Sequence, residues 1–321
     1  MHRILLVKTS SLGDVVHNLP VVSDLRAQFP DAEIDWAVER VFAEIPELHG
    51  GVSRVIAVEP RRWRRRLFAA DTWREIRTAR AQLQARNYDA VVDTQGLIKS
   101  ALVACLAPGR RYGLDWSSSR EPLRPFYHRT FRVAWDLHAV DRNRRLVAQA
   151  LGYAVTSPPD YGLDDADASL PWLDELTLSQ PLAVLLHATS AKAKLWPEQQ
   201  WVKLGDYLHY HGVRSILTWG NDEERRRSER IAKLIKDAVI APRLTLHDAA
   251  RLLQRARVVF GVDTGLSHLA VAVGAPTVGI YCATDPAATG LYGSKLAVNV
   301  GGKAGPPAVA AVIAAWQTLG A

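Results

Sequence analysis

The stretch Val258-Val259-Phe260-Gly261-Val262-Asp263-Thr264-Gly265-Leu266-Ser267-His268 decides the fold of this chain. Its first five residues are mainly β-branched or apolar and end abruptly at Asp263, so they predict a buried strand. Gly265 then marks a tight turn, and an Ala/Leu/Val-rich helical pattern begins at Leu266. We therefore predict a strand, a turn and a helix, the repeating unit of an open α/β sheet.

The start of that helix is a candidate anion site. The first N–H groups of a helix have no partner inside it, and the helix dipole favours negative charge there. Amides of Thr264, Gly265 and Leu266 could bind a phosphate while the Asp263 carboxylate accepts hydrogen bonds from hydroxyls. This combination suggests a phosphate-linked sugar. Taken alone, Asp263 is better explained as an N-cap and His268 as a packed or solvent-facing histidine.

Length and composition predict a two-domain globular protein. At 321 residues the chain exceeds what one core usually serves, so we expect domains at 1–160 and 161–321. No apolar run is long enough for a membrane span, and the N-terminus lacks a signal-peptide core. The two cysteines, Cys105 and Cys282, give no disulfide framework or metal cluster, which fits a cytoplasmic protein.

Basic residues are concentrated in the first half of the chain. The formal net charge is +7. Much of the excess lies in Arg61–Arg66, predicted as a loop, and in a second band that contains Arg110, Arg111, Arg120, Arg124, Arg129 and Arg132. Charge runs are usually solvated, but this one has no interleaved acid. It could bind nucleic acid, an anionic membrane or an acidic acceptor.

Alternating patterns predict a doubly wound parallel sheet in each half. Strand patterns occupy 4–7, 33–38, 54–58 and 90–93, and then 182–186, 213–218, 258–262 and 277–281. Helical patterns follow most of them, with Pro20 expected to kink the first. Ligands of such sheets bind at the carboxyl ends of the strands, so we place the site in a cleft between two β/α domains. Neither a P-loop nor a dinucleotide fingerprint is present.

Five loop motifs resemble those of the bacterial lipopolysaccharide heptosyltransferases, which have the two-Rossmann architecture called GT-B. They extend over nearly the whole chain, which makes them more specific together than any one alone. The segment His187–Ser190, where heptosyltransferase II has a Pro-Gly-Ala-Glu-type segment, favours the heptosyltransferase I branch. The motifs are Val7–Val15, Arg61–Arg64, Asp93–Ser100, His187–Ser190 with Lys194 and Trp196–Glu198, and Val262–His268.

The resemblance implies an inverting, metal-independent transfer of L-glycero-D-manno-heptose from ADP-heptose to a Kdo sugar of Kdo2-lipid A, with no cofactor. The first domain would bind the acceptor and the second the donor. Asp14 would be the general base, although the local sequence alone favours a helix cap. Lys194 would stabilise the departing ADP, with Lys192 as a competitor for that role.

The same resemblance implies the remaining site residues. Glu224 would bind the ribose and Pro242 and Leu244 the adenine, although Glu224 could be a surface helix residue. The implied donor-binding residues are Thr189, Ser190, Lys194, Glu224, Pro242, Leu244, Asp263, Thr264, Gly265, Leu266 and His268. The implied acceptor-binding residues are Ser11, Gly13, Arg61, Arg62, Arg65 and Arg120. The D-x-D segment Asp165–Asp167 is interpreted as a solvated acidic patch, not a metal site.

The expected partners are ADP-heptose, Kdo2-lipid A and an anionic membrane surface. We expect a monomer on the cytoplasmic face of the inner membrane that does not bind nucleic acid, with the C-terminal helix near 307–319 a candidate to pack on the first domain. One alternative is a GT-B transferase or epimerase for another nucleotide sugar, or one with a heptosyltransferase II-type acceptor. A more distant alternative is a basic nucleic-acid-binding protein, which would bind with steep salt dependence but would not explain the loop motifs.

Overall fold

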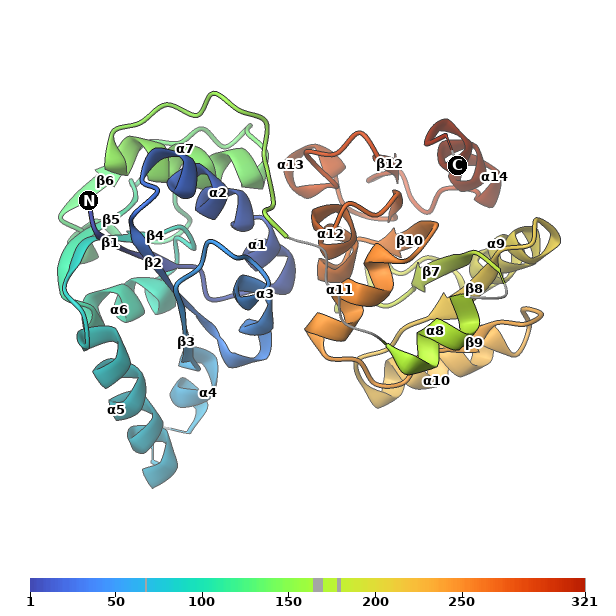
Figure 1. The fold of residues 1–321 in the computed structure, drawn as a ribbon, viewed down its shortest axis with the longest axis horizontal. Helices are drawn as coiled ribbons and strands as arrows, with labels where there is room; N and C mark the ends of the chain where they lie inside the picture. Colours follow the sequence, from blue (N-terminus) through green and yellow to red (C-terminus); the bar gives the residue numbers. More distant parts are fainter. Residues whose placement is uncertain (67, 164–169, 178–179, 321) are drawn as a thin grey trace. The chain divides into compact units, whose positions relative to one another are not determined.

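A computed structural model describes residues 1–66, 68–163, 170–177 and 180–320. The chain divides into two compact units, Met1–Leu163 and Asp164–Ala321, and each is built on a six-stranded parallel sheet (Figure 1). The D-x-D segment Asp165–Asp167 lies outside the described residues. Within the described ranges, no helix combines the length and apolarity needed to cross a membrane.

The sheet of the first unit consists of strands β1 (Arg3–Val7), β2 (Glu33–Glu39), β3 (Arg54–Val58), β4 (Tyr88–Asp93), β5 (Gly109–Leu114) and β6 (Arg129–Phe131). Their order in the sheet is β3-β2-β1-β4-β5-β6. The chain winds outward from β1 in one direction and from β4 in the other. This leaves a switch point between β1 and β4, where loops at the carboxyl ends separate and a ligand can bind.

Helices cover both faces of this sheet. In Figure 1, α2 and α7 lie on one face, and α5 and α6 on the other. Leu5 and Val7 of β1 belong to the same buried cluster as Leu83 of α5 and Val103 of α6, because alternate strand residues point to the same face. The helices are α1 (Leu12–Val16), α2 (Leu19–Gln28), η1 (Arg40–Phe42), α3 (Glu44–Glu47), α4 (Pro60–Arg65), α5 (Ala70–Gln84), α6 (Ile98–Leu106), η2 (Arg124–Phe126) and α7 (Ala139–Leu151).

Two sequence predictions in the first unit were wrong. The helix expected to kink at Pro20 is instead two helices, and Pro20 lies in the first turn of α2, where a missing N–H removes no hydrogen bond. The arginine segment predicted as a loop is mostly helix α4, which begins at Pro60. The sequence also gave no signal for β5 and β6, whose polar residues hide their strand pattern.

The sheet of the second unit consists of β7 (Leu182–Leu186), β8 (Arg214–Leu217), β9 (Val239–Ile240), β10 (Val258–Val262), β11 (Thr277–Tyr281) and β12 (Ala297–Gly301). Its order, β12-β11-β10-β7-β8-β9, repeats that of the first sheet with β7 and β10 at the switch point. The predicted strands at 182–186, 258–262 and 277–281 are confirmed. All three are buried along their length, as parallel strands covered on both faces should be.

The helices of the second unit pack this sheet around aromatic side chains. The rings of Trp196 and Trp201 pack edge to face with their centroids 5.0 Å apart, and those of Phe260 and Trp316 with their centroids 5.8 Å apart. The C-terminal helix α14 packs against α9, β11 and β12. The helices are α8 (Pro171–Thr177), η3 (Lys192–Lys194), α9 (Glu198–Tyr210), α10 (Asp222–Ala232), α11 (Leu246–Gln254), α12 (Gly265–Ala272), α13 (Pro286–Thr289) and α14 (Val309–Thr318).

Candidate functional site

The turn from β10 into α12 forms as predicted. Thr264 is the extended N-cap residue and α12 begins at Gly265. Among the described residues, the backbone N–H groups of Thr264, Gly265 and Leu266 donate no hydrogen bond. These amides lie at the carboxyl edge of the sheet beside the switch point, where an anion can bind them.

Close packing holds the start of α12 against β10. The Ser267 hydroxyl donates to the Val262 carbonyl at 2.7 Å. A Cβ at Gly261 would lie only 2.1 Å from the Ser267 hydroxyl oxygen, so any side chain there would displace that hydroxyl from the Val262 carbonyl. Gly261, which looked like an ordinary strand residue, therefore permits the close approach of α12.

Asp263 connects three loops at this edge. Its Oδ2 lies 2.8 Å from the Lys194 Nζ and accepts a 2.7 Å hydrogen bond from the Thr284 hydroxyl. Its backbone carbonyl accepts a 2.9 Å hydrogen bond from the Thr189 hydroxyl. The structure thus brings together three residues that the resemblance implied, Asp263, Lys194 and Thr189. Thr284 was not predicted: it follows β11, and only the adjacency of β11 and β10 brings it here.

Other implied donor residues lie on the loops after β8 and β9. The Glu224 carboxylate accepts the Gly220 N–H at 2.7 Å in the first turn of α10. The Trp219 indole donates to the Ala241 carbonyl at 2.8 Å and so joins the two loops. Pro242 is exposed and Leu244 is half-buried just beyond. An apolar surface and a carboxylate therefore lie at the ends of neighbouring strands.

Three further residues near β7 and α12 differ in exposure. Ser190 and Lys192 are exposed on the loop after β7, and within the described part of the chain Lys192 has no ion-pair partner. Lys194 is half-buried against Asp263, so the position of its ammonium is defined by that contact. His268 is buried within α12, with 6% of its surface exposed.

His187 stabilises the loop after β7 from below. Its Nε2 lies 2.7 Å from the Ser228 hydroxyl, and that hydroxyl donates to the Thr218 carbonyl. Because the hydroxyl proton is used on Thr218, His187 donates through Nε2. Burial, together with the charge of Arg227, lowers the pKa of His187 to about 4, so the ring is neutral at physiological pH. His187 therefore supports the Thr189 loop as an uncharged group.

In the first unit, Asp14 lies in α1 at the carboxyl end of β1. Its Oδ2 accepts the Ser11 backbone N–H at 2.8 Å and the Ser11 hydroxyl at 3.0 Å. The capping role that the local sequence favoured is therefore present, although the N-cap is Ser11 and the helix begins at Leu12. No hydrogen bond to Asp14 Oδ1 is found among the described residues, so that oxygen remains available. Gly13 lies beside Asp14 in the same turn.

A side-chain amide anchors the loop before Asp14. Gln95 Oε1 accepts the backbone N–H groups of Thr9 at 3.1 Å and Ser10 at 3.0 Å. Gln95 is itself held by Asp93, whose Oδ1 accepts the Gln95 N–H at 2.8 Å and whose Oδ2 accepts the Tyr127 hydroxyl at 2.7 Å. Burial raises the pKa of Asp93, while these hydrogen bonds favour the carboxylate. The sequence identified Asp93–Ser100 as a motif, but it did not predict that Gln95 anchors the loop before Asp14.

A buried lysine closes the same network. Lys8 is 6% exposed, and its Nζ donates to the Thr94 carbonyl at 2.9 Å and to Asn143 Oδ1 at 3.3 Å. Burial lowers the pKa of Lys8, and the neighbouring carboxylates of Asp14 and Asp93 oppose that shift. Lys8 therefore joins the loop after β4 to α7 beside the loop that carries Asp14.

Helix α4 presents part of the arginine cluster to a basic pocket of about 310 Å³, called the cationic pocket below, which is lined by Pro60, Arg61, Arg64, Arg65 and Lys99. The Ser10 hydroxyl accepts hydrogen bonds from Arg61 at 3.0 Å and Lys99 at 2.5 Å. Glu39, 5% exposed, pairs with both cations at 3.4 and 3.1 Å. Within the described residues, Arg64 and Arg65 have no ion-pair partner. The pocket thus has a net positive charge.

Arg62 does not line this pocket. Residues 61, 64 and 65 share one helical face, whereas Arg62 points elsewhere and forms an ion pair with Glu75 of α5. That ion pair lowers the pKa of Glu75. The structure therefore groups Arg61 and Arg65 as implied, adds Arg64 and Lys99, and leaves Arg62 outside.

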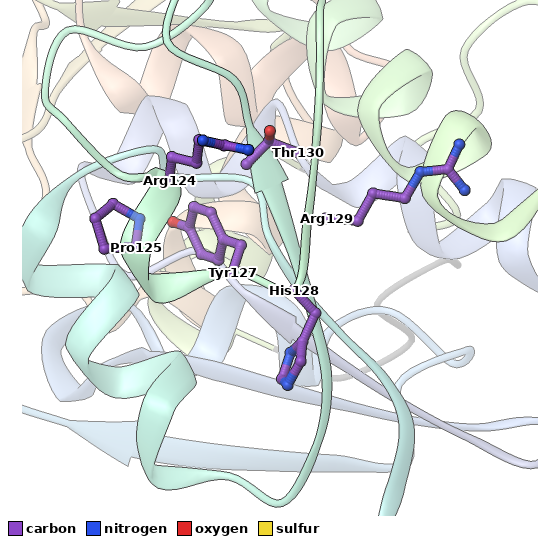
Figure 2. Close-up of a pocket in the computed structure, with 6 residues that line it drawn as sticks. All are labelled: Arg124, Pro125, Tyr127, His128, Arg129 and Thr130. Atoms are coloured by element: carbon purple, nitrogen blue, oxygen red, sulfur yellow. The ribbon is translucent and has the colours of Figure 1, made fainter.

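The second basic band is dispersed. Arg120 and Arg142 both contact the Trp135 ring, with guanidinium carbons 5.9 and 3.8 Å from its centroid. Arg124 and Arg129 instead line a polar pocket of about 590 Å³ beside the start of β6, together with Pro125, Tyr127, His128 and Thr130 (Figure 2). Figure 2 shows the Arg129 side chain directed away from those of Arg124 and Thr130.

Two units with this strand order, each carrying polar loops at the carboxyl ends of its strands, define a glycosyltransferase of the GT-B class. The chain belongs to glycosyltransferase family 9 (heptosyltransferase), whose model matches residues 76–309.

Curated relatives and solved structures agree with this assignment. The chain is 44% identical over 295 residues to lipopolysaccharide heptosyltransferase 1 of Escherichia coli K12, covering 91% of this chain and 92% of that one. It is also 44% identical to the enzyme of the same name from Pseudomonas aeruginosa, over 91% and 81% of the two chains. The structure of E. coli heptosyltransferase WaaC with ADP-2-deoxy-2-fluoro heptose matches with a TM-score of 0.88 and 40% identity, over 98% and 99%.

Proposed function

We propose that this protein transfers L-glycero-D-manno-heptose from ADP-heptose to a Kdo sugar of Kdo2-lipid A, with inversion and without a metal ion. The observation that carries the proposal is the convergence of Lys194, Asp263 and the open amides of 264–266 at one sheet edge. Relatives named lipopolysaccharide heptosyltransferase 1 and the ADP-heptose analogue bound by WaaC support the same donor and the same pathway.

In the proposed donor site, the α12 amides and Lys194 bind the diphosphate, and Asp263 accepts hydrogen bonds from heptose hydroxyls. The Lys194 ammonium has two anionic partners in this proposal. In the free protein it contacts Asp263, and during the reaction it stabilises the negative charge that grows on departing ADP. Thr189, Ser190 and His268 complete this part of the site. Glu224 binds the ribose, and Pro242 and Leu244 face the adenine.

Asp14 serves as the general base of the proposed reaction. The acceptor hydroxyl oxygen forms a bond to the anomeric carbon, its proton passes to the free Oδ1 of Asp14, and the bond from that carbon to the diphosphate breaks. ADP leaves with the electron pair. One displacement inverts the anomeric centre, and a positioned base contributes typically about 10²- to 10⁴-fold. The Ser11 N–H and hydroxyl hold the other carboxylate oxygen of Asp14, Oδ2, in place.

The acceptor is proposed to bind near the cationic pocket. Phosphates and carboxylates of Kdo2-lipid A match the guanidinium groups of Arg61 and Arg65. Ser11 and Gly13 lie on the Asp14 loop, and Arg62 and Arg120 would meet anions outside the pocket. The same basic surface would hold a monomer at the anionic cytoplasmic face of the inner membrane.

The decisive experiment is turnover of ADP-heptose and Kdo2-lipid A by the full chain in excess EDTA. We expect heptosylated product whose new glycosidic bond has the inverted configuration. Calorimetric titration with ADP and UDP tests the alternative of another nucleotide sugar, and only ADP should bind tightly. Absence of product with an equal affinity for UDP would overturn the proposal.

A further inference from the structure

An apolar groove adjoins the cationic pocket. It has a volume of about 600 Å³ between α4 and α6, and its walls are mainly the side chains of Trp63, Ile76, Ile98, Leu102, Val103 and Leu106. Figure 1 shows α4, α5 and α6 together on one side of the first sheet. Nothing in the donor site or in the proposed chemistry uses this groove.

Large apolar side chains at its rim face solvent. Leu102 is 54% exposed and Ile98 is 39% exposed, both on α6. Exposed apolar residues are ordinary when they are scattered, but a contiguous set that lines a concave surface indicates a binding site. One carboxylate belongs to the groove, and it is already occupied: Glu121 Oε2 accepts the Ile98 N–H at 2.5 Å. The occupant is therefore expected to be apolar.

The groove and the cationic pocket are continuous. Pro60, Arg64 and Lys99 line both of them. One molecule that filled the whole depression would need an anionic group at one end and hydrocarbon at the other. A lipid whose phosphate or carboxylate lies next to an acyl chain has this arrangement of charge and apolar surface.

We propose that the α4–α6 groove binds one acyl chain of the anionic lipid acceptor while the cationic pocket binds its head group. This rests on the proposed function, and it assigns a place to a part of the acceptor that takes no part in heptose transfer. The acyl chain would cover Leu102 and Ile98 and pack against Trp63. Arg64 and Lys99, at the boundary, would contact the anion next to the chain.

The first test measures binding of monomeric alkyl phosphates to the full chain by calorimetry, below their critical micelle concentrations. Each added methylene that enters the groove should raise affinity roughly fourfold. Octyl phosphate should therefore bind roughly 100-fold or more tightly than butyl phosphate. Equal affinities would show that only the head group is bound and would overturn the proposal. Octyltrimethylammonium, with the opposite charge, should bind far more weakly.

Matched variants locate the effect. Leu102→Glu places a charge on the groove rim, and Leu234→Glu changes an exposed leucine in the second unit, 65% exposed, that lies outside this groove. The octyl-to-butyl affinity ratio should collapse toward one in Leu102→Glu and stay at the wild-type value in Leu234→Glu. Ile98→Gln provides a second, milder rim variant. If all variants keep the wild-type octyl-to-butyl affinity ratio, the alkyl chain binds elsewhere and the groove assignment is wrong.

A kinetic test separates this inference from the proposed function. The KM for Kdo2-lipid A and for the same glycan stripped of its acyl chains should be measured with fixed ADP-heptose. Leu102→Glu should raise the acylated-to-deacylated KM ratio at least tenfold over wild type, and Leu234→Glu should not. A ratio unchanged by Leu102→Glu overturns the groove assignment although transfer persists. Failure to transfer heptose to either acceptor overturns the proposed function, and the alkyl phosphate titration still decides the groove.

Discussion

The Lys194 ammonium lies 2.8 Å from the Asp263 carboxylate. The two charges proposed to bind the donor are therefore paired in the free protein. Pairing reduces the cost of burying Asp263, which has only 10% of its side chain exposed. A ligand that brings its own negative charge next to Lys194 and its own hydroxyls to Asp263 replaces this contact without leaving either group unpaired.

Lys194→Ala should lower kcat/KM by about 10²- to 10³-fold, because it removes the cation nearest the departing diphosphate. Lys192→Ala is the matched control, since it lies two residues away on the same loop and is exposed. Steady-state kinetics and ADP titration of both variants measure the difference. Equal losses in the two variants would contradict the assignment of Lys194.

Asp14→Asn separates the proposed base from the helix cap. An asparagine oxygen can still accept the Ser11 N–H, so the thermal unfolding temperature should change little. The rate constant kcat should fall about 10²- to 10⁴-fold, with ADP affinity retained. Ser11→Ala, which removes one hydrogen bond to Asp14 and keeps the carboxylate, should reduce kcat far less. An Asp14→Asn variant with wild-type kcat would remove Asp14 from the chemistry.

Gln95→Leu should loosen the loop that precedes Asp14. The amides of Thr9 and Ser10 are buried and would lose their acceptor, at a cost of about 1–3 kcal/mol each in the free energy of unfolding. We also expect kcat to fall, because the loop positions Asp14. Gln95→Glu retains an acceptor oxygen and should recover most of both losses. Chemical denaturation and kinetics on the pair test this, and identical behaviour of the two variants would count against an anchoring role.

The buried His187 should make stability depend on pH. Its pKa is about 4 in the folded chain against 6.5 when unfolded, so between these values the unfolded state binds more protons. The contribution of His187 to the free energy of unfolding is therefore fully present above pH 6.5 and is lost as the pH falls toward 4. Between pH 7 and pH 5 the contribution of this one group amounts to roughly 2 kcal/mol.

His187→Gln removes that titration. Urea unfolding at pH 7 and pH 5 should show a smaller difference in the variant than in the wild type, even if the variant is less stable at both. The same pH dependence in both proteins would show that other groups titrate in this window.

The sequence predicted most where the signal was local. The β10–α12 junction could be predicted because an apolar run, an acidic residue and a glycine follow one another within eight positions. Asp14 and Lys194 could be named only through the resemblance, since each also has an ordinary explanation as a cap or a solvated lysine. Contacts set by sheet order were out of reach: Thr284 meets Asp263 only because β11 and β10 are neighbours.

The arginine cluster shows a different limit. Treated as a loop, Arg61–Arg66 offered no reason to distinguish one arginine from another. Once Pro60 is taken as the first residue of a helix, the spacing of 61, 64 and 65 separates them from Arg62. Lys99 joins the first group from α6, far along the chain, through the shared Ser10 hydroxyl. That contact has no counterpart in the local sequence.

Gly261 determines how closely the first turn of α12 packs on β10. Because Gly261 has no side chain, the Ser267 hydroxyl reaches β10 and donates a hydrogen bond to the Val262 carbonyl. The methyl group of an alanine at 261 would lie where the Ser267 hydroxyl now lies, and the hydrogen bond that joins the first turn of α12 to the Val262 carbonyl would be lost. Donor affinity would then change although every atom proposed to touch the donor was still present.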